Sequence, residues 1–391
     1  MMRQSQPSSA PLRVFVEAHM FDHGFEGSAS FVQGIYRALL DAYPTHYRLF
    51  LGGRRPERAF EALGRPPQAE PVAYRADNRH LRLLFDIPQA IQRTGAQLAH
   101  FQYFTPLRKT CPWLVTIHDV LFNDFPQYFP PNYRHLRNVL FPLSARRAEL
   151  VTTVSGYSRQ RIAHWYRGWG ISEASVHVVP NGVDWPALGP GVPAMARPPS
   201  APAGDYLLCV SRFEPRKNQA LMLQAFVQAR LWERGLALLF VGARTLAVPD
   251  FDTLLAAAPP AARAAVHFRA NLPAQELAAL YQHAVAAVYP SLAEGFGIPP
   301  LEALAAGTPS LCARTTAMAD FDFLAPFFFE PLEIDDLLRR LQPLLDNPAQ
   351  ARALAIAAAG QARQRYTWHR AAEQVHQLIQ RQVCNAPAQC P

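Results

Sequence analysis

Two glutamates bracket a turn rich in glycine and proline in the second half of the chain. Residues 291–312 read SLAEGFGIPPLEALAAGTPSLC, with Glu294 before the turn and Glu302 after it. Carboxylates accept hydrogen bonds from hydroxyl groups, and glycines let a ligand approach the backbone. The prolines predict a helix that begins at Pro299 or Pro300, whose N-terminus suits phosphate or sugar oxygens. We therefore predict that Glu302, in the first helical turn, and Glu294 bind one polyhydroxyl ligand. The alternative is that Glu302 only stabilises the helix N-terminus, by about 0.3–1 kcal/mol.

Two cations follow a predicted strand in LLCVSRFEPRKNQALML, residues 207–223. Arg212 ends the strand, and Lys217 precedes a predicted helix that Asn218 is expected to cap. Fixed cations at this position stabilise a departing diphosphate, and each charge-assisted hydrogen bond contributes about 1.5–3 kcal/mol. The alternative is ordinary surface charge, although Lys217 is one of only two lysines, the other being Lys109.

Two further connections carry polar or flexible residues at predicted strand ends. His118 and Asp119 end the apolar stretch WLVTIHDV. A histidine there can bond a substrate hydroxyl or stabilise positive charge on a sugar ring, and a structural histidine bonded to a backbone carbonyl is an equal alternative. In HMFDHGFEGSASF, Gly24 and Gly27 precede the first predicted helix and indicate a phosphate- or acceptor-binding turn.

These residues need a scaffold, and the chain alternates apolar strands with helical segments. Strand character occurs in LRVFVEAH, YRLFLGG, AQLAHFQ, WLVTIHD, ELVTTVS and VHVV, and again in YLLCVS, LALLFVGA, AVHFRA and VAAVYP. Helical patterns include 30–43, 131–147, 156–167, 333–346 and 349–382. Wholly apolar strands separated by helices predict an α/β fold with parallel sheets covered on both faces.

The length of 391 residues predicts two domains, because one hydrophobic core rarely exceeds about 250–300 residues. Residues 184–204 form a proline-rich linker without periodicity. We therefore predict one doubly wound, Rossmann-like domain over 1–183 and a second over 205–368, facing each other across a cleft. Residues 369–391 are expected to form a helix that can cross back to the first domain, followed by a tail.

Composition limits the classes of partner and compartment. The net charge of +8 favours anionic partners. The polar start MMRQSQPSSAPLR does not resemble a secretion signal, and no run of 18 apolar residues occurs, so we expect a cytosolic, soluble protein. Five scattered cysteines indicate neither disulfides nor zinc. Asp-Phe-Asp at 250–252 and 320–322 can hold a divalent cation, but neither stretch is at a clear strand end, and no metal is expected.

These stretches together resemble glycosyltransferase family 4, the large retaining group with the GT-B fold. RFEPRKN and residues 291–312 carry the likeness in the second half, with PNGVD at 180–184 before them. VTIHDVLFNDFPQYFP, LVTTVSGYSRQRI and YTWHRAAEQV extend it over most of the chain. Glu294 and Glu302 fit the family signature of two glutamates separated by seven residues.

The resemblance implies roles for residues of the second, nucleotide-sugar-binding domain. Arg212 and Lys217 would bind the donor diphosphate and stabilise it as the leaving group. Glu302 would hold the nucleotide ribose. The donor sugar and its phosphate would be held by Glu294 and by the backbone of Gly295, Phe296 and Gly297.

The resemblance also implies roles in the first, acceptor-side domain. His118 would contact the donor sugar, and Gly27 would belong to a loop that faces the acceptor and the diphosphate. Ala29 stands where the family often has a second glycine, which departs from the pattern in this loop. Family chemistry proceeds with retention and without a metal or other cofactor, and transfers a hexosyl or N-acetylhexosaminyl group from a UDP- or GDP-linked donor.

Bacterial members often build lipopolysaccharide, O-antigen or other surface glycans on lipid-linked or oligosaccharide acceptors. NRHLRLLF (78–85) and NYRHLRNVLFPLSARR (132–147) mix basic and apolar residues, which suits a peripheral site on an anionic membrane at its cytoplasmic face. The alternative is a solvated helix whose apolar side packs inward. FPQYFP favours a mannosyltransferase-like subgroup by resemblance, and no nucleic acid partner is expected.

Two other functions fit a two-domain nucleotide-sugar protein. One is a GT-B-type sugar-nucleotide epimerase, and the other is a non-catalytic nucleotide-sugar sensor. A phosphorylase of this shape is disfavoured, because it would be much longer and would need a pyridoxal lysine. Product formation separates a transferase from a sensor, which has no turnover to lose.

Overall fold

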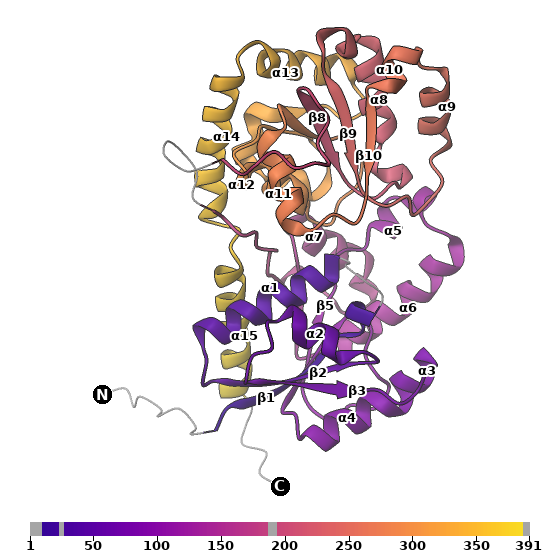
Figure 1. Ribbon diagram of the computed structural model, residues 1–391. Coiled ribbons are helices and arrows are strands. Elements are labelled where there is room, and N and C mark those ends of the chain that lie inside the picture. Colours follow the sequence, from indigo (N-terminus) through magenta and orange to yellow (C-terminus); the bar gives the residue numbers. More distant parts are fainter. Residues whose placement is uncertain (1–9, 23–26, 187–193, 386–391) are drawn as a thin grey trace. The chain divides into compact units, whose positions relative to one another are not determined.

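A computed structural model describes residues 10–22, 27–186 and 194–385, with side chains to residue 382. It divides into two compact units (Figure 1). The N-terminal unit contains the chain up to Asn123, then Phe129–Gly182 and the segment from Trp368 onward. The C-terminal unit contains Asp124–Tyr128 and Val183–Thr367. Gly24 and residues 187–193 of the proline-rich linker lie outside the described residues.

The N-terminal unit is built on a seven-stranded sheet with the order β3-β2-β1-β4-β5-β6-β7, and all its strand pairs are parallel. Its strands are β1 (Leu12–Glu17), β2 (Tyr47–Gly53), β3 (Ala69–Ala73), β4 (Leu98–Gln102), β5 (Trp113–Thr116), β6 (Leu150–Thr153) and β7 (Val176–Val178). Its helices are α1 (Gly27–Ala42), α2 (Pro56–Ala62), α3 (Arg79–Leu81), the π-helix η2 (Arg82–Asp86), α4 (Ile87–Thr94), α6 (Pro131–Arg147), α7 (Gly156–Trp165) and α15 (Trp368–Asn385). The short helix α5 (Leu121–Asp124) ends at the boundary between the units.

The C-terminal unit repeats the same plan with six parallel strands in the order β10-β9-β8-β11-β12-β13. They are β8 (Tyr206–Val210), β9 (Ala237–Val241), β10 (Val266–Arg269), β11 (Ala286–Tyr289), β12 (Ser310–Ala313) and β13 (Phe328–Phe329). The helices are α8 (Gln219–Gln228), α9 (Pro249–Ala257), α10 (Pro260–Ala264), α11 (Ala274–His283), α12 (Ile298–Ala305), α13 (Ile334–Asp346) and α14 (Pro348–Arg363).

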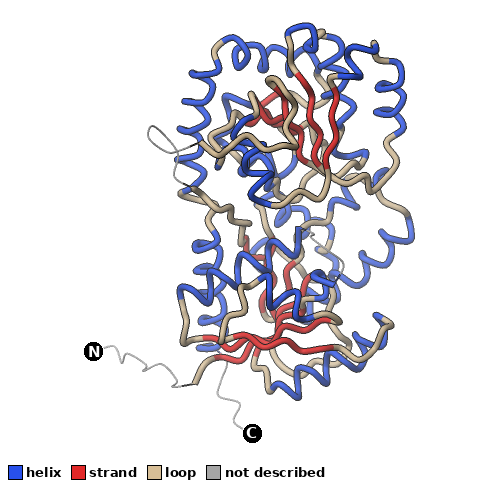
Figure 2. Tube along the Cα trace, viewed as in Figure 1, coloured by secondary structure: helices blue, strands red, loops and turns tan. Residues whose placement is uncertain are grey.

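Helices lie on both sides of the strands in each unit, as Figure 2 shows. The central strands are apolar along their length because neither face meets water. Phe15, Phe101 and Trp113 are buried in the first sheet, and Leu208 and Phe240 in the second. The prediction of two doubly wound, Rossmann-like parallel sheets is therefore confirmed for each unit.

Strand β3 was missing from the sequence-based prediction for a physical reason. Its sequence, AEPVA, contains Pro71, which lacks an amide proton for a ladder hydrogen bond and breaks the apolar pattern. Strand β3 lies at the edge of the sheet and pairs only with β2 among the described strands. An edge position is where a sheet tolerates proline.

The helical pattern over 349–382 forms two helices, because the chain breaks between α14 and α15. At this break the backbone carbonyl of Tyr366 accepts hydrogen bonds from the Val183 amide, at 3.0 Å, and from Trp185 Nε1, at 2.8 Å. The Tyr366 ring packs edge-on against Phe321 and Phe296. After the break, α15 packs along α1 of the N-terminal unit.

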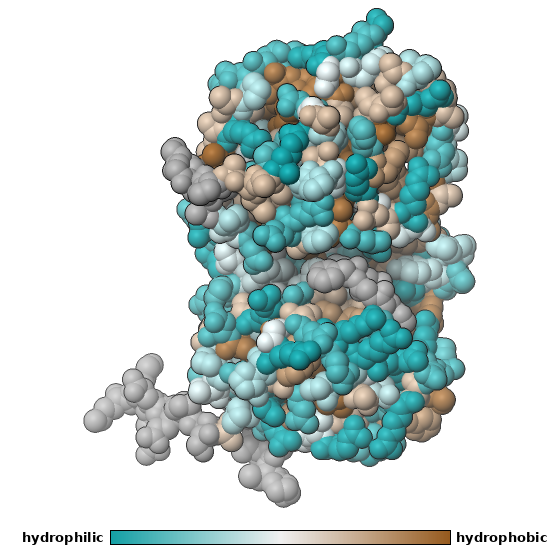
Figure 3. Space-filling view, viewed as in Figure 1, coloured by the Kyte–Doolittle hydropathy of each residue, from teal (hydrophilic) through white to brown (hydrophobic). Residues whose placement is uncertain are grey.

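No helix among the described residues is long and apolar enough to cross a membrane. Figure 3 shows hydrophilic residues over much of the visible face of both units, with hydrophobic residues in separate patches between them.

Candidate functional site

The loop after β8 carries the predicted cations. Strand β8 ends at Val210, and a short 3-10 turn, Pro215–Lys217, leads into α8. The predicted side-chain cap by Asn218 is wrong: Asn218 has a left-handed backbone (φ 51°, ψ 40°) and makes no capping bond. Its side-chain Nδ2 is buried without a hydrogen-bond partner among the described residues. The left-handed residue turns the chain between Lys217 and the helix α8 that follows it.

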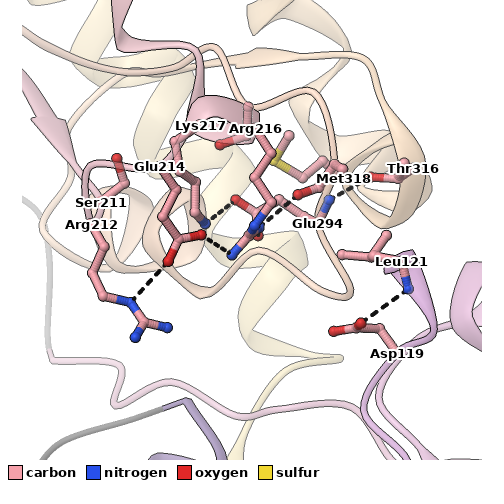
Figure 4. Close-up of polar contacts among 12 residues, drawn as sticks. Asp119, Leu121, Ser211, Arg212, Glu214, Arg216, Lys217, Glu294, Thr316 and Met318 are labelled. Atoms are coloured by element: carbon pink, nitrogen blue, oxygen red, sulfur yellow. Dashed lines mark hydrogen bonds and ion pairs between the residues drawn. The ribbon is translucent and has the colours of Figure 1, made fainter. Parts of the chain in front are cut away.

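Lys217 and Arg216 both contact Glu294, which comes from the loop after β11. Lys217 Nζ lies 2.5 Å from Glu294 Oε1, and Arg216 Nη1 lies 3.2 Å from Glu294 Oε2 (Figure 4). Arg216 Nη1 also donates to the Ala293 carbonyl at 2.8 Å. A backbone hydrogen bond also joins the two loops, because the Leu292 amide of the loop after β11 donates to the Arg216 carbonyl at 2.8 Å. Two neighbouring strands of the sheet, β8 and β11, bring these loops together.

The ion network continues from Arg216 to a more exposed arginine. Glu214 lies 2.9 Å from Arg216 Nη2 and 3.5 Å from Arg212 Nε. Arg212 follows β8 by two residues, and its side chain is 49% exposed, whereas that of Lys217 is 13% exposed. Positive and negative groups therefore alternate in the order Arg212, Glu214, Arg216, Glu294 and Lys217. The exposed fraction of the cations falls along this order, from 49% to 17% to 13%.

Burial and neighbouring charges shift the pKa values of Glu294 and Lys217 in opposite directions. Burial alone would raise the pKa of Glu294, but the charges of Lys217 and Arg216 lower it to about 2. Burial lowers the pKa of Lys217, and the neighbouring Glu294 opposes that effect. Glu294 is therefore a carboxylate at neutral pH, and it compensates the positive charges of Lys217 and Arg216.

The turn of 294–297 leads directly into α12. Gly297 has a φ of 104°, and a Cβ on it would lie 3.0 Å from Met318 Cγ, so the position requires glycine. The Phe296 side chain is buried and packs edge-on against Phe321. Only its backbone is therefore suited to bind a ligand. The Glu294 amide is held by Thr316 Oγ1 at 2.9 Å.

The prediction that Glu302 lies in the first turn of its helix is wrong. Helix α12 begins at Ile298, immediately after the left-handed Gly297, so Glu302 is its fifth residue. It makes a side-chain contact with α11 instead: Tyr281 Oη donates to Glu302 Oε2 at 3.0 Å. Burial raises the pKa of Glu302, and the Tyr281 hydroxyl acts against this rise. The simple helix-capping alternative for Glu302 is not supported by this position.

His118 and Gly27 lie in the N-terminal unit. His118 follows β5 by two residues and is buried, with Nε2 2.7 Å from Gln102 Oε1 and its ring edge-on to Phe31 at 5.0 Å. Its ring partner is thus a side-chain amide and not the backbone carbonyl of the structural alternative. Burial lowers the pKa of His118 to about 4. Gly27 is the first residue of α1, and a Cβ on it would meet no described atom within 4 Å.

The structure thus brings some predicted residues together and leaves others apart. Lys217 and Glu294 are in contact, and Arg212 joins them through Glu214 and Arg216. Glu302 engages a different partner, Tyr281. The roles of all these residues in binding and catalysis stay predictions.

Sequence reasoning missed Arg216, Glu214, Tyr281 and Gln102. The signal for Arg216 was its position beside Lys217 in EPRKN, where two adjacent cations follow a strand end. Tyr281 had no such signal, since it lies in another helix and is 21 positions from Glu302 in the sequence. Only the packing of α11 beside α12 reveals the contact.

The Asp-Phe-Asp stretches engage arginines. Asp252 lies 2.8 Å from Arg244, and Asp322 lies 2.6 Å from Arg365. Within the described residues, no group of three or more histidine, cysteine or acidic side chains is arranged to hold a metal ion.

Two family models match successive parts of the chain. Glycosyltransferase Family 4 matches residues 26–185, and Glycosyl transferases group 1 matches residues 195–363. The first covers most of the N-terminal unit with its His118 loop. The second covers both loops of the ion network and helix α12.

Several curated relatives with similar sequences are mannosyltransferases by name, and one from Frankia alni, 36% identical over 48% of each chain, is a D-inositol 3-phosphate glycosyltransferase. An MMP α-(1→4)-mannosyltransferase of Mycolicibacterium hassiacum is 28% identical, with coverage of 62% of this chain and 57% of that protein. O-antigen chain mannosyltransferase B of Escherichia coli is 29% identical (62% and 65%). A GDP-mannose-dependent α-(1-6)-phosphatidylinositol monomannoside mannosyltransferase of Mycolicibacterium smegmatis is 30% identical (59% and 62%). The chain spans less than two thirds of the length of each of these four relatives.

A solved structure shows the same fold over nearly the whole chain. The sucrose-phosphate synthase from Thermosynechococcus elongatus superposes with a TM-score of 0.72 at 19% identity, covering 96% of this chain and all of that one. The two family models together match residues 26–185 and 195–363, and the chain belongs to glycosyltransferase family 4.

Proposed function

We propose that this protein is a retaining glycosyltransferase that transfers mannose from GDP-mannose to a glycan or lipid-linked acceptor of a surface polysaccharide. The observation that carries the proposal is the buried Lys217–Glu294–Arg216 cluster at the carboxyl ends of β8 and β11. The names of three relatives support mannose as the sugar, and one of these relatives is named as GDP-mannose-dependent. A UDP-linked donor is the alternative to be tested beside it.

In this proposal, the cluster supplies positive charge near the diphosphate, on which negative charge develops during the reaction. When the bond between the sugar C1 and the phosphate oxygen breaks, its electron pair passes to the diphosphate, which gains negative charge. Lys217, Arg216 and Arg212 would stabilise that charge in the transition state more than in the bound donor. The acceptor oxygen then bonds C1, and its proton passes to the departing phosphate oxygen.

Glu294 has two successive partners in this proposal. Without donor it compensates Lys217 and Arg216. When the diphosphate supplies negative charge to these cations, Glu294 can accept hydrogen bonds from hydroxyls of the donor sugar. Glu302, with one oxygen held by Tyr281, keeps the other available for the ribose.

We also propose that transfer needs no divalent metal, because arginine and lysine side chains would neutralise the diphosphate. Turnover should therefore be the same with EDTA and with added Mg²⁺ or Mn²⁺. A strict requirement for either metal would contradict this part of the proposal.

The central experiment combines binding with turnover. GDP, UDP, GDP-mannose and UDP-hexoses are screened by thermal shift, since a ligand that binds only the native state raises the melting temperature. The best donor is then incubated with a mannan or lipid-linked oligosaccharide acceptor, and product is measured. Glu294→Ala should abolish product formation. Binding without turnover would favour the sensor, and conversion of the donor sugar without acceptor would favour the epimerase.

A surface of the N-terminal unit supports a lipid-linked acceptor. Three exposed apolar residues lie on α3 and η2, and two on α6: Leu81, Leu84, Phe85, Leu136 and Val139. Phe85 is 56% and Val139 52% exposed, whereas Phe141 and Ala145 of α6 pack inward. Helix α6 has no acidic residue. Burial lowers the pKa of Arg137 on α6, and the charge of Arg79 on α3 acts in the same direction.

Basic and apolar groups on one surface suit an anionic membrane, to which each basic residue contributes about 1 kcal/mol. We expect sedimentation with phosphatidylglycerol vesicles and little with phosphatidylcholine vesicles, and the difference should shrink at high salt. Val139→Glu should weaken binding, whereas Leu354→Glu, an exposed apolar position on α14, should not. Equal sedimentation of both variants would contradict this surface.

A further inference from the structure

A chain of buried hydrogen bonds reaches His118 through Gln102. Gln102 is the last residue of β4 and is 3% exposed. Its amide has two histidine partners: Oε1 lies 2.7 Å from His118 Nε2, and Nε2 lies 3.0 Å from His100 Nε2. His100 and Gln102 are two residues apart on one strand, so their side chains share a face of the sheet.

The chain continues across the sheet on both sides of His100. His100 Nδ1 lies 2.8 Å from the Tyr36 hydroxyl of α1, and its Nε2 lies 2.8 Å from Thr116 Oγ1 of β5. Thr116 Oγ1 lies 2.7 Å from Thr152 Oγ1 of β6. Neighbouring parallel strands place these residues in one row, because Gln102 pairs with Thr116 and Thr116 pairs with Thr152.

The chemistry of the amide determines where the histidine protons lie. An amide NH₂ only donates, so His100 Nε2 accepts from Gln102 and the His100 proton is on Nδ1, directed at Tyr36. An amide carbonyl only accepts, so His118 Nε2 carries the proton that Gln102 Oε1 receives. Burial holds the pKa of both rings low, at about 3 for His100 and about 4 for His118, so each ring has one proton at neutral pH.

We infer that Gln102 is a positioning residue that fixes His118 in the Nε2–H tautomer and leaves the Nδ1 lone pair to accept a hydrogen bond from a substrate hydroxyl. The link to the substrate rests on the proposed sugar transfer. The tautomer itself depends only on the buried network. His118 would then orient a hydroxyl as a neutral acceptor, and it would not act as a cation.

The tautomer is measured directly in protein labelled with ¹⁵N-histidine. Ring ¹⁵N shifts distinguish a protonated from an unprotonated nitrogen, and the His118 signal is identified by its loss in His118→Gln. We expect proton-bearing Nε2 and bare Nδ1 at neutral pH. A proton on Nδ1, which a Gln102 amide rotated by half a turn would produce, overturns the inference whether or not the protein is a transferase.

Variants test the role in turnover. Gln102→Leu should mix the two His118 tautomers and lower kcat about tenfold, the equivalent of one hydrogen bond of about 1.4 kcal/mol. GDP affinity should not change. Gln102→Glu keeps the acceptor for His118 Nε2–H, so it should restore the tautomer. Its carboxylate should raise the His118 pKa, because an added negative charge stabilises the imidazolium. The other titratable groups that face this network are His100 and Tyr103.

Asn138→Leu is the matched control. Asn138 and Asn123 exchange two side-chain amide hydrogen bonds, at 2.7 and 2.8 Å, in the same unit. The control should lose stability without altering the His118 signal or kcat. An unchanged His118 signal and rate in folded Gln102→Leu would overturn the inference. If that variant does not fold, the wild-type tautomer and the Gln102→Glu pH profile still decide it.

Discussion

Burial makes the charge of Lys217 more effective than that of an exposed lysine. Its ammonium lies among Glu294, Arg216 and Glu214 with little solvent, so an approaching diphosphate would meet a cation that water screens weakly. Lys217→Met keeps an unbranched side chain of similar length and removes the charge. We expect kcat to fall about 10²–10³-fold, as for the loss of one preorganised group that stabilises transition-state charge.

Lys109→Met is the matched control for Lys217→Met, because these are the only two lysines in the chain. Lys109 pairs with Glu149 in the N-terminal unit. Its replacement should leave kcat unchanged. Steady-state kinetics with saturating donor compares the two variants, and a kcat of Lys217→Met within twofold of the wild type would contradict the assigned role.

Tyr281 should set the pH at which the nucleotide is released. Glu302 can accept two ribose hydrogen bonds only when ionised, so affinity falls as pH drops through its pKa. Burial already raises that pKa above the usual value, and the Tyr281 hydroxyl opposes the rise. Tyr281→Phe should therefore raise the pKa further and move the loss of GDP affinity to higher pH, which calorimetric titration across pH measures.

Tyr206→Phe controls for the loss of a buried tyrosine hydroxyl in the same unit. Tyr206 donates to the Leu280 carbonyl at 2.7 Å, whereas Tyr281 donates to Glu302. It should lower stability without moving the pH at which GDP affinity is lost. Identical pH curves for the two variants would refute the role of Tyr281.

Residue types and spacing predicted which cationic and acidic residues belong to the candidate site. They could not predict which of these residues contact one another. Lys217 and Glu294 were predicted as ligand-binding residues, yet their mutual contact spans 77 positions and depends on β8 lying beside β11. Arg216 and Tyr281 gain their roles from the same long-range packing. Gln102 is similar, because its amide becomes informative only between two buried histidines.

At the scale of elements, local pattern predicted most strands of the sheet interiors and many of the helices, but it missed the interior strand β12. It failed where tertiary contacts override propensity. The segment 349–382 is rich in helix formers, but its chain turns at Tyr366, which other aromatic rings hold in the C-terminal unit. Helix α15 then belongs to the N-terminal unit, and the sequence predicts a helix over 369–391 that can cross back to the first domain.

The docking of α15 depends on a glycine of α1. A Cβ at Gly34 would lie 2.2 Å from the Trp368 ring, so the two helices can approach only without it. Gly34→Ala should destabilise the N-terminal unit by about 1–3 kcal/mol, the typical cost of overpacking. The double variant Gly34→Ala with Trp368→Leu should recover part of this loss, since contacting residues are not additive.

Gly360 of α14 provides the opposite control. Its Cβ would meet no described atom within 4 Å, and it lies inside a helix. Gly360→Ala should therefore stabilise the protein by about 0.5–1 kcal/mol. Thermal unfolding followed by circular dichroism compares the variants. A melting temperature of Gly34→Ala equal to or above the wild type would show that α15 does not require this glycine.

For the whole molecule, acid should weaken the two units in different pH ranges. His100 and His118 have folded pKa values of about 3 and about 4, against 6.5 when unperturbed. The folded N-terminal unit therefore binds fewer protons than its unfolded chain below pH 6.5. The stability from these histidines is complete above that pH and declines toward pH 4 and 3, each contributing a slope of about 1.4 kcal/mol per pH unit.

Glu294 acts in a lower window in the C-terminal unit. Its folded pKa of about 2 lies below the unperturbed 4.5, so its contribution is complete above 4.5 and is lost as pH falls through 2. Between pH 7 and 5 we therefore expect hydrogen exchange to increase in peptides of β4 and β5 before those of β8 and β11. His100→Gln, which cannot gain a proton, should reduce the pH dependence in the N-terminal unit, whereas the exposed His135→Gln should not. Earlier opening of β8 and β11 would mean that groups other than these buried histidines govern acid stability.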